Sequence, residues 1–322
     1  MFSLNAILIV GIASLLYLPN HINGVGSVNN GIEVIDLSAL QDVNLPLVAN
    51  GGSPCFEHHP IFWKFPSYFF PFFSEEYFEW IDLLESIDQA NGQFVMLEVG
   101  AGLGRWAAYG GRVAKSRDIS FWLGLVEGEP FRAEVGIDEE MRKNNISKSN
   151  YHIFKTGVGS VNKQTFFYVS RDEQTLENWY GQCILLDHDR VTQLLGRTYY
   201  GRPLVQTQYG YTAVQIEQQK FSEILNAINF SIIDLCDFDV QGSEFEVIQE
   251  SINILNSRVK RLHIGTHSHE IEHSLRDLLK NNNWQLIRDY PFAQENETPY
   301  GKISFVDGVQ TWVNKRFMNK FD

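Results

Sequence analysis

The sequence has few cysteines, no internal repeat and no low-complexity tract. Three scattered cysteines, Cys55, Cys183 and Cys236, occur in 322 residues, so neither a disulfide framework nor a CxxC metal site follows from them. Lys and Arg form no run, and the formal net charge is −13. A polyanion would be repelled on average, which disfavours a nucleic-acid substrate. The sparse cysteines favour a reducing compartment.

The chain also has no hydrophobic run of full membrane-spanning length. Residues 4–18 are apolar and uncharged, but a spanning helix needs about 20 residues. The first basic residue is Lys64, so no positive charge orients this segment. Three interpretations stay open: a secretory signal, a short anchor, or a helix packed on the domain. We favour membrane association through residues 4–18, with a cytoplasmic catalytic domain.

With 44% hydrophobic and 20% charged residues, the chain is long enough for one large domain with an extension. We divide it into a signal or anchor segment (1–24), an N-terminal extension (25–90) and a main domain (91–322). Residues 25–54 are rich in Gly, Asn and Ser and predict a linker. Residues 56–80 are dense in aromatics and interrupted by prolines. We expect them to pack on the main domain or to form a lid over it. An amphipathic helix is expected from Glu75 to Ile87.

Apolar runs of strand length alternate with helical segments from residue 94 onward, which predicts an α/β fold with a parallel sheet. Strands are expected at 94–99, 121–127, 151–156, 232–238, 259–265, 284–289 and 303–314. Helices are expected at 104–115, 130–144, 243–254 and 270–281. Residues 157–229 interrupt the alternation with a strand pair (165–169 and 212–216), and are the expected place for substrate-specific decoration.

A glycine turn follows the first of these strands, in Glu98-Val-Gly100-Ala-Gly102-Leu-Gly104. Glycines let a ligand approach the main chain, and the next helix directs its amides towards that ligand. Dinucleotide binders place their third glycine further out. The carboxylate of Glu98 would repel a pyrophosphate but suits an ammonium or sulfonium group. The turn therefore favours S-adenosylmethionine (SAM) over NAD, although such a turn alone is equally compatible with no ligand.

An acid at the end of the second strand strengthens the interpretation of the glycine turn. Glu127 follows Gly104 by 23 residues, where doubly wound sheets place an acid against the ribose hydroxyls of a nucleoside. A carboxylate accepts hydrogen bonds from both hydroxyls. Alone, Glu127 would be an exposed acid at a strand end; together with the turn it predicts a nucleoside site.

Two further acids, Asp237 and Asp239, end the strand at 232–238 and point to the same side of it. Unpartnered buried carboxylates are costly, so we expect them at a cleft. There they would bind a substrate hydroxyl, accept its proton or hold a divalent cation. The alternative for Asp239 is a cap on the following helix.

Histidines cluster after the strand at 259–265. His267 is placed to act as a base on a hydroxyl, because imidazole titrates near neutral pH. His263, His269 and His273 also suggest a metal site, but convergence of three or four ligands does not follow from this spacing. We favour a base over a metal site, and a solvated helix face for His269 and His273.

These segments together resemble the FkbM-type family of class I SAM-dependent methyltransferases, over residues 90–322. The match rests on Asp239-Val-Gln-Gly-Ser-Glu244, on LEVGAGLGRW and LVEGEP, and on the segments 179–182, 265–268 and 300–312. The resemblance implies a Rossmann-like seven-stranded fold and methyl transfer from SAM, usually to a hydroxyl of a sugar or small metabolite. The family usually has a lysine where this chain has Asp237, which reverses a charge at the cleft.

The resemblance also implies roles for single residues. SAM would be held by Glu98, Gly100, Gly102, Gly104 and Glu127, with Trp106 near the turn and Gly157 and Val158 beside the adenine. The candidate base is His267 or Asp239, with Glu244 in support and Asp237 close by; no metal is assigned. Two alternatives remain, a SAM-binding scaffold without catalysis and an NAD-dependent oxidoreductase.

Overall fold

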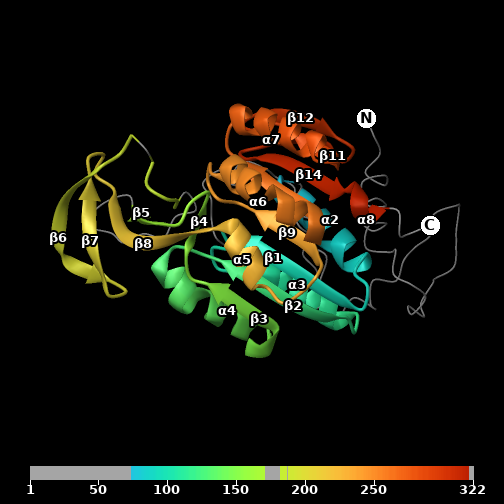
Figure 1. The fold of residues 1–322 in the computed structure, drawn as a ribbon, viewed down its shortest axis with the longest axis horizontal. Helices are drawn as coiled ribbons and strands as arrows, with labels where there is room; N and C mark the ends of the chain where they lie inside the picture. The colour runs from blue at the N-terminus through green and yellow to red at the C-terminus, as the bar shows by residue number, and fades with distance from the viewer. Residues whose placement is uncertain (1–73, 171–181, 187, 319–322) are drawn as a thin grey trace, which may run out of the picture.

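A computed structural model describes residues 74–170, 182–186 and 188–318 (Figure 1). The helices include a π turn, η3, and a 3-10 turn, η4. They are α2 (Glu76–Asp88), α3 (Arg105–Ser116), η3 (Arg132–Gly136), α4 (Ile137–Lys143), η4 (Lys148–Asn150), α5 (Phe221–Ala227), α6 (Glu244–Arg258), α7 (His269–Asn281) and α8 (Lys315–Met318).

Seven strands form the central sheet, in the order β11-β14-β10-β9-β1-β2-β3. They are β1 (Gln93–Val99), β2 (Ser120–Val126), β3 (Tyr151–Phe154), β9 (Ile233–Phe238), β10 (Val259–Thr266), β11 (Trp284–Tyr290) and β14 (Gly308–Asn314). The five strands from β10 to β3 in this order run parallel, and β14 is antiparallel to both of its neighbours. This is the seven-stranded class I methyltransferase sheet, as predicted.

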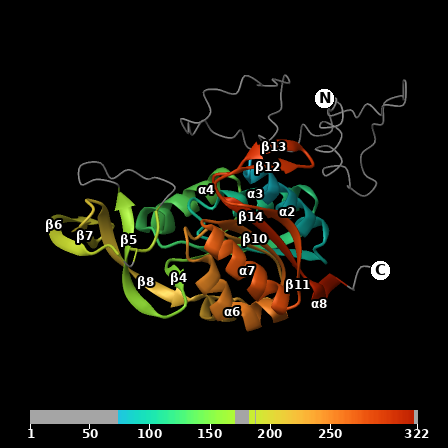
Figure 2. The same ribbon diagram turned by 90° about the horizontal axis from the view of Figure 1, so that it is seen from above.

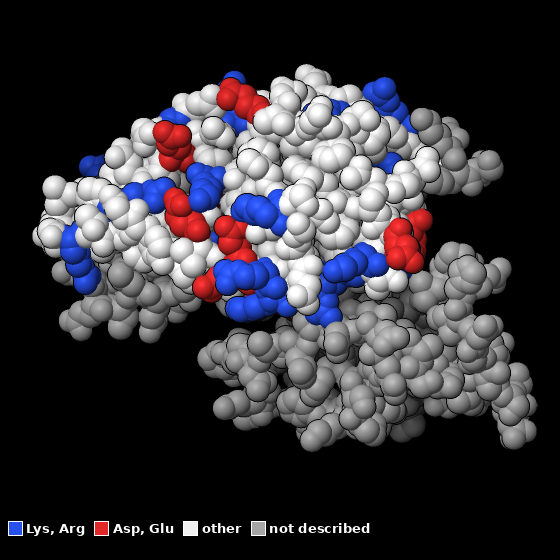
Figure 3. All heavy atoms as spheres, turned by 90° about the horizontal axis from the view of Figure 1, so that it is seen from below, with Lys and Arg blue, Asp and Glu red and all other residues white. Residues whose placement is uncertain are grey.

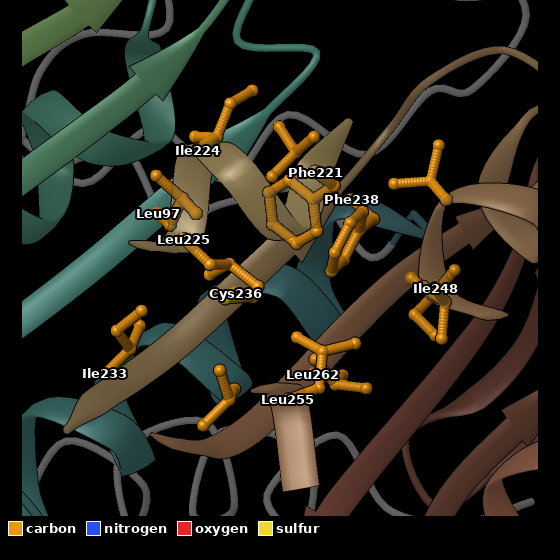
Figure 4. Packing of buried hydrophobic residues seen from close by; sticks show 14 of the residues in the cluster. Leu97, Phe221, Ile224, Leu225, Ile233, Cys236, Phe238, Ile248, Leu255 and Leu262 are labelled. Atoms are coloured by element: carbon orange, nitrogen blue, oxygen red, sulfur yellow. The ribbon is translucent and has the colours of Figure 1, made fainter. Parts of the chain in front are cut away.

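Helices cover both faces of this sheet, with α2 and α3 on one side and α6 and α7 on the other (Figure 2). On the α2–α3 side, Phe94, Met96 and Leu235 pack against the helices. On the other side, Leu97, Cys236 and Leu262 pack against α5 and α6 (Figure 4). Successive residues of each strand thus contribute to opposite cores, which is the pattern of a sheet buried on both faces.

A second sheet projects from the body (Figure 1). It consists of β4 (Gly157–Gly159), β5 (Lys163–Ser170), β6 (Val191–Tyr199), β7 (Arg202–Thr207) and β8 (Thr212–Lys220). The predicted strand pair is confirmed as β5 with β8, which are antiparallel. The β6–β7 hairpin was not predicted, because β6 is exposed along most of its length and lacks the alternating apolar pattern of a half-buried strand.

Two predicted elements differ in detail. The single strand expected from 303 to 314 is wrong: β13 (Gly301–Ser304) pairs with β12 (Glu295–Thr298) in a small separate sheet, and β14 starts after a bend at Val306 and Asp307. The helix expected at 130–144 begins with the π turn η3 before α4. Asp307-Gly308 is a turn sequence that interrupts the apolar run, and it indicates the break between β13 and β14.

The helix predicted from Glu75 to Ile87 is confirmed as α2. Its Phe78 packs with Tyr290 and Phe305, at ring-centroid distances of 4.5 and 5.9 Å. The rest of the aromatic segment and residues 4–18 lie outside the described residues. Among the helices that are described, none is long and apolar enough to cross a membrane.

On the face drawn in Figure 3, basic and acidic side chains lie interspersed. Ion pairs such as Lys155 with Glu134, at 2.7 Å, contribute to this mixed charge on the surface.

Candidate cofactor and acceptor site

The glycine turn sits at the carboxyl edge of the parallel strands. The amides of Gly100 and Ala101 both donate to the carbonyl of Val126, at 3.0 Å, which folds the turn over β2. Gly100 has a φ of 84°, and a Cβ there would collide with the carbonyl oxygen of Asp239. Only glycine permits this approach. The turn is thereby packed between the ends of β2 and β9, beside the acids that end both strands.

Glu98 is buried in β1 and bonded to the start of α3. Its Oε2 accepts from the amide of Ala107 at 2.7 Å, so the carboxylate lies at the positive end of the helix dipole. The pKa of Glu98 is nevertheless raised well above its ordinary value, first by burial and then by the charge of Asp237. Trp106 lies in the same first turn of α3, with its ring 5.3 Å from that of Trp80.

Glu127 lies directly against the glycine turn. Its Oε2 accepts from the amide of Gly102 at 2.6 Å, and its Oε1 accepts from the amide of Glu129 at 2.6 Å. Burial raises its pKa to about 7, and the amides and Arg132 oppose that rise. A buried carboxylate fixed beside a glycine turn fits the recognition of ribose hydroxyls.

Gly157 and Val158 occupy β4, where the second sheet begins. Gly157 lies against Gly128, the residue after Glu127, while Val158 is packed in the core with Val99 and Val126. A cavity of about 280 Å³ opens beside them, between the end of β2 and the second sheet. Its lining is mostly polar: Gly128, Pro130, Ala133, Lys155, Gln164, Arg202, Gln215, Ile216 and Glu217.

His267 follows β10 and is surrounded by three carboxylates, which come from the end of β9, the start of α6 and the bend before β14. Its Nδ1 lies 2.8 Å from Oε1 of Glu244, and its Nε2 lies 3.4 Å from Asp239 and 3.6 Å from Asp307. Burial would lower the pKa of His267, but Glu244, Asp239 and Asp307 raise it to about 9. The imidazole is therefore protonated at neutral pH.

Asp239 and Glu244 occupy different positions around this imidazolium. The side chain of Asp239 is 52% exposed, whereas that of Glu244 is fully buried. Desolvation by the surrounding protein, and then the charges of Asp307 and Glu244, raise the pKa of Asp239 to about 6, while His267 opposes the rise. Asp239 is thus the more accessible of the two acids, and Glu244 holds the imidazole. Gly242 donates its amide to Glu244 at 3.0 Å, which fixes that carboxylate.

Asp237 belongs to a row of polar side chains that crosses the sheet under α2. The strand register places Glu98 beside Asp237, Asp237 beside His263, and His263 beside Thr311. Cross-strand neighbours share one face of a sheet. Asp237 is buried, and its pKa is raised to about 7, first by burial and then by other acids such as Asp239 and Asp82, while His263 opposes the rise.

Helix α2 binds this row through Asp82, a residue that the sequence did not single out. Asp82 is completely buried and accepts from His263 Nδ1 at 2.7 Å, Thr311 Oγ1 at 2.5 Å and Arg288 Nη1 at 2.7 Å. Arg261 adds a fourth contact, at 2.9 Å. Burial opposes ionisation, but the hydrogen bond from His263 and the two guanidiniums lower the pKa of Asp82 to about 2.

A signal for this contact was available in the sequence. Acidic residues recur every three positions in α2, from Glu76 to Asp88, so consecutive members such as Glu79 and Asp82 share one face of it. That pattern indicates an acidic stripe towards the sheet, but the sequence does not show which basic residues, some 180 positions later, meet it.

The strand order of the central sheet is that of a class I methyltransferase, and the acids described here lie at the ends of its strands. The family model described as Methyltransferase FkbM domain matches residues 98–286, more than half of the chain. The chain belongs to this family, as its motifs predicted. Membership implies methyl transfer with SAM as the donor and decides against the NAD-dependent oxidoreductase.

Several known proteins are similar to this chain. A protein of Jannaschia sp. (strain CCS1) named "Putative methyltransferase" is 29% identical over 231 residues, which cover 72% of this chain and 76% of that protein. Among solved structures, the methyltransferase FkbM from Methylobacillus flagellatus KT is 10% identical, with a TM-score of 0.39 over 70% of this chain. The chain spans 45% of the length of that structure. M. capricolum TrmK in complex with S-adenosyl-homocysteine (SAH) is 6% identical, with a TM-score of 0.36, over 72% of this chain and 67% of that one.

Proposed function

We propose that this protein methylates a hydroxyl oxygen of a sugar or another small metabolite, bound at the carboxyl ends of β9 and β10. SAM supplies the electrophilic methyl group when it is bound. The proposal rests above all on one observation: an exposed carboxylate, Asp239, lies beside a half-buried imidazole, His267, next to the glycine turn. An acceptor hydroxyl needs a group that orients it and takes its proton, and this pair supplies both.

Within the pair, we assign the base to Asp239 and positioning to His267. A histidine whose pKa is near 9 holds its proton at neutral pH, so it acts as a donor and a positive charge rather than as a base. Glu244 fixes its Nδ1, which directs Nε2 towards Asp239. Glu98, Gly100, Gly102, Gly104 and Glu127 are assigned to the cofactor, with Trp106, Gly157 and Val158 at its borders.

The experiment has a binding arm and a turnover arm. Calorimetry with SAH should show one site per chain, weakened in Glu127→Ala. A panel of sugars, other hydroxyl compounds, amines and thiols, read by release of SAH, should give turnover with hydroxyl compounds that Asp239→Asn abolishes. Transfer to amines or thiols alone would refute the hydroxyl acceptor. Binding of SAH without turnover on any compound would favour the scaffold that does not catalyse.

A further inference from the structure

Glu79 of α2, Asp237 of β9 and His263 of β10 converge between helix and sheet. One ligand atom from each lies within 4.8 Å of the other two. Ligand atoms around one divalent cation lie up to about 4 Å apart, given bonds of ~2.1 Å. A small side-chain adjustment closes the difference, and Glu79, which is half-buried, is the member with room to make it.

Asp237 has an unused acceptor in this group. Its side chain is 95% buried, since the residue is 5% exposed, and its Oδ1 makes no hydrogen bond within the described part of the chain. Leaving a buried carboxylate oxygen unpaired costs several kcal/mol by typical magnitudes. The usual solutions in proteins are a partner side chain or a bound cation. This oxygen is therefore an independent indication that something occupies the group.

His263 is oriented as metal-binding histidines are. Its Nδ1 lies 2.7 Å from Oδ2 of Asp82, and the ionised Asp82 favours a proton on Nδ1. The other nitrogen, Nε2, is then left as a lone-pair donor. Metal-ligating histidines almost always give their second nitrogen to a carboxylate or carbonyl in this way. Arg261 and Arg288 form ion pairs with Asp82, so the carboxylate that orients His263 is itself fixed in position.

We infer that Glu79, Asp237 and His263 form a binding site for a divalent transition-metal cation between α2 and the central sheet. The two carboxylates and one imidazole suit Mn²⁺, Fe²⁺ or Zn²⁺ better than Mg²⁺ or Ca²⁺, which prefer oxygen ligands alone. The site lies next to the acceptor cleft but shares none of the residues assigned to the base or the cofactor turn. The inference of a metal site can therefore be tested independently of the proposed methylation.

Mn²⁺ is the best probe, because Cys183 and Cys236 would compete for softer ions such as Zn²⁺. The full chain is freed of metal with a chelator and titrated with MnCl₂, and free Mn²⁺ is followed by its electron paramagnetic resonance signal. We expect one Mn²⁺ per chain, not displaced by a tenfold excess of Mg²⁺. Asp237→Asn and Glu79→Gln should each weaken binding at least ~10-fold, the loss typical of groups around a metal.

Glu76→Gln is the matched control, since it makes the same charge change one turn away on α2, at an exposed position. It should bind Mn²⁺ as the unaltered protein does. A second readout guards against misfolded variants: Mn²⁺ should raise the melting temperature of the unaltered protein and of Glu76→Gln, but not that of Asp237→Asn. The inference fails if Mn²⁺ does not bind at millimolar concentration, or if Asp237→Asn binds it equally well. The trio would then be a closed cluster of side chains that holds no cation.

Discussion

The carboxylates at the ends of β1 and β2 differ from those around the end of β9 in the groups that contact them. Glu98 and Glu127 accept hydrogen bonds from main-chain amides of Ala107, Gly102 and Glu129. Around the end of β9, Glu244 and Asp239 lie beside the side chain of His267, and Oδ1 of Asp237 has no hydrogen bond within the described residues. Main-chain amides stay in place whatever binds, whereas side-chain partners can exchange protons or yield to a ligand. The carboxylates of β1 and β2 are therefore suited to holding a cofactor, and those around the end of β9 to proton transfer.

The largest effect expected from this contrast concerns turnover. Asp239→Asn keeps the shape of the side chain but removes its basicity, so kcat should fall by ~10²–10⁴-fold, the usual contribution of a general base. SAH affinity, measured by calorimetry, should stay within about twofold. Asp307→Asn removes another of the three acids beside His267 and should cost less. Equal losses in both variants would mean that the charge around His267 matters and not a base at Asp239.

The next effect concerns stability, at the contact between α2 and the sheet. Asp82→Ala leaves Arg261 and His263 without their buried partner, and breaking such a pair typically costs ~3–5 kcal/mol. Urea unfolding measures the loss. Asp88→Ala, at the end of the same helix, removes the partly exposed partner of Arg117 and should cost ~1 kcal/mol or less. If the two variants proved equally stable, the polar row would contribute no more than a surface pair.

Cofactor affinity should be reduced by substitutions of the carboxylates of β1 and β2, and not by those around His267. Glu127→Ala removes an ionised acceptor, and hydrogen bonds to charged groups contribute ~1.5–3 kcal/mol, so SAH should bind about 10–100-fold more weakly. Asp307→Asn, in the bend before β14, is the comparison and should leave SAH binding unchanged. Because the pKa of Glu127 is about 7, SAH affinity should also weaken as the pH falls below 7. A flat profile from pH 6 to 8 would contradict ribose recognition by this carboxylate.

The smallest effect concerns the pH dependence of folding through His267. Its pKa rises from 6.5 to about 9 on folding, so its stabilisation is fully present below pH 6.5 and is lost as the pH rises through 9. The free energy of unfolding should therefore drop across this window by at least ~1 kcal/mol more than in His267→Gln. Urea titrations at pH 6, 7.5 and 9 measure the difference. If the free energy of unfolding had the same pH dependence in both proteins, the carboxylates would not raise the pKa of His267.

The sequence predicted what depends on neighbouring residues and missed what depends on distant ones. The glycine turn with Glu98, and Glu127 at the next strand end, follow from two short motifs at a typical separation. Asp239 and His267 were predicted from their places at strand ends and Glu244 from the family motif. The protonation of His267 was not predicted, because its three carboxylates come from separate segments. Glu79 and Asp82 escaped notice since their partners lie far along the chain, and the β6–β7 hairpin is too exposed to leave a periodic pattern.

The polar row under α2 has a practical consequence for anyone shortening this protein. The family match begins at residue 98, and the apolar alternation begins near residue 94, so either limit invites a cut after α2. Such a cut would discard Asp82 and leave Arg261, His263, Arg288 and Thr311 facing water or one another across the sheet. Phe78 would also leave the ring cluster with Tyr290 and Phe305. The smallest fragment that folds should therefore include all of α2 and start no later than Ser74, well ahead of the boundary that sequence similarity suggests.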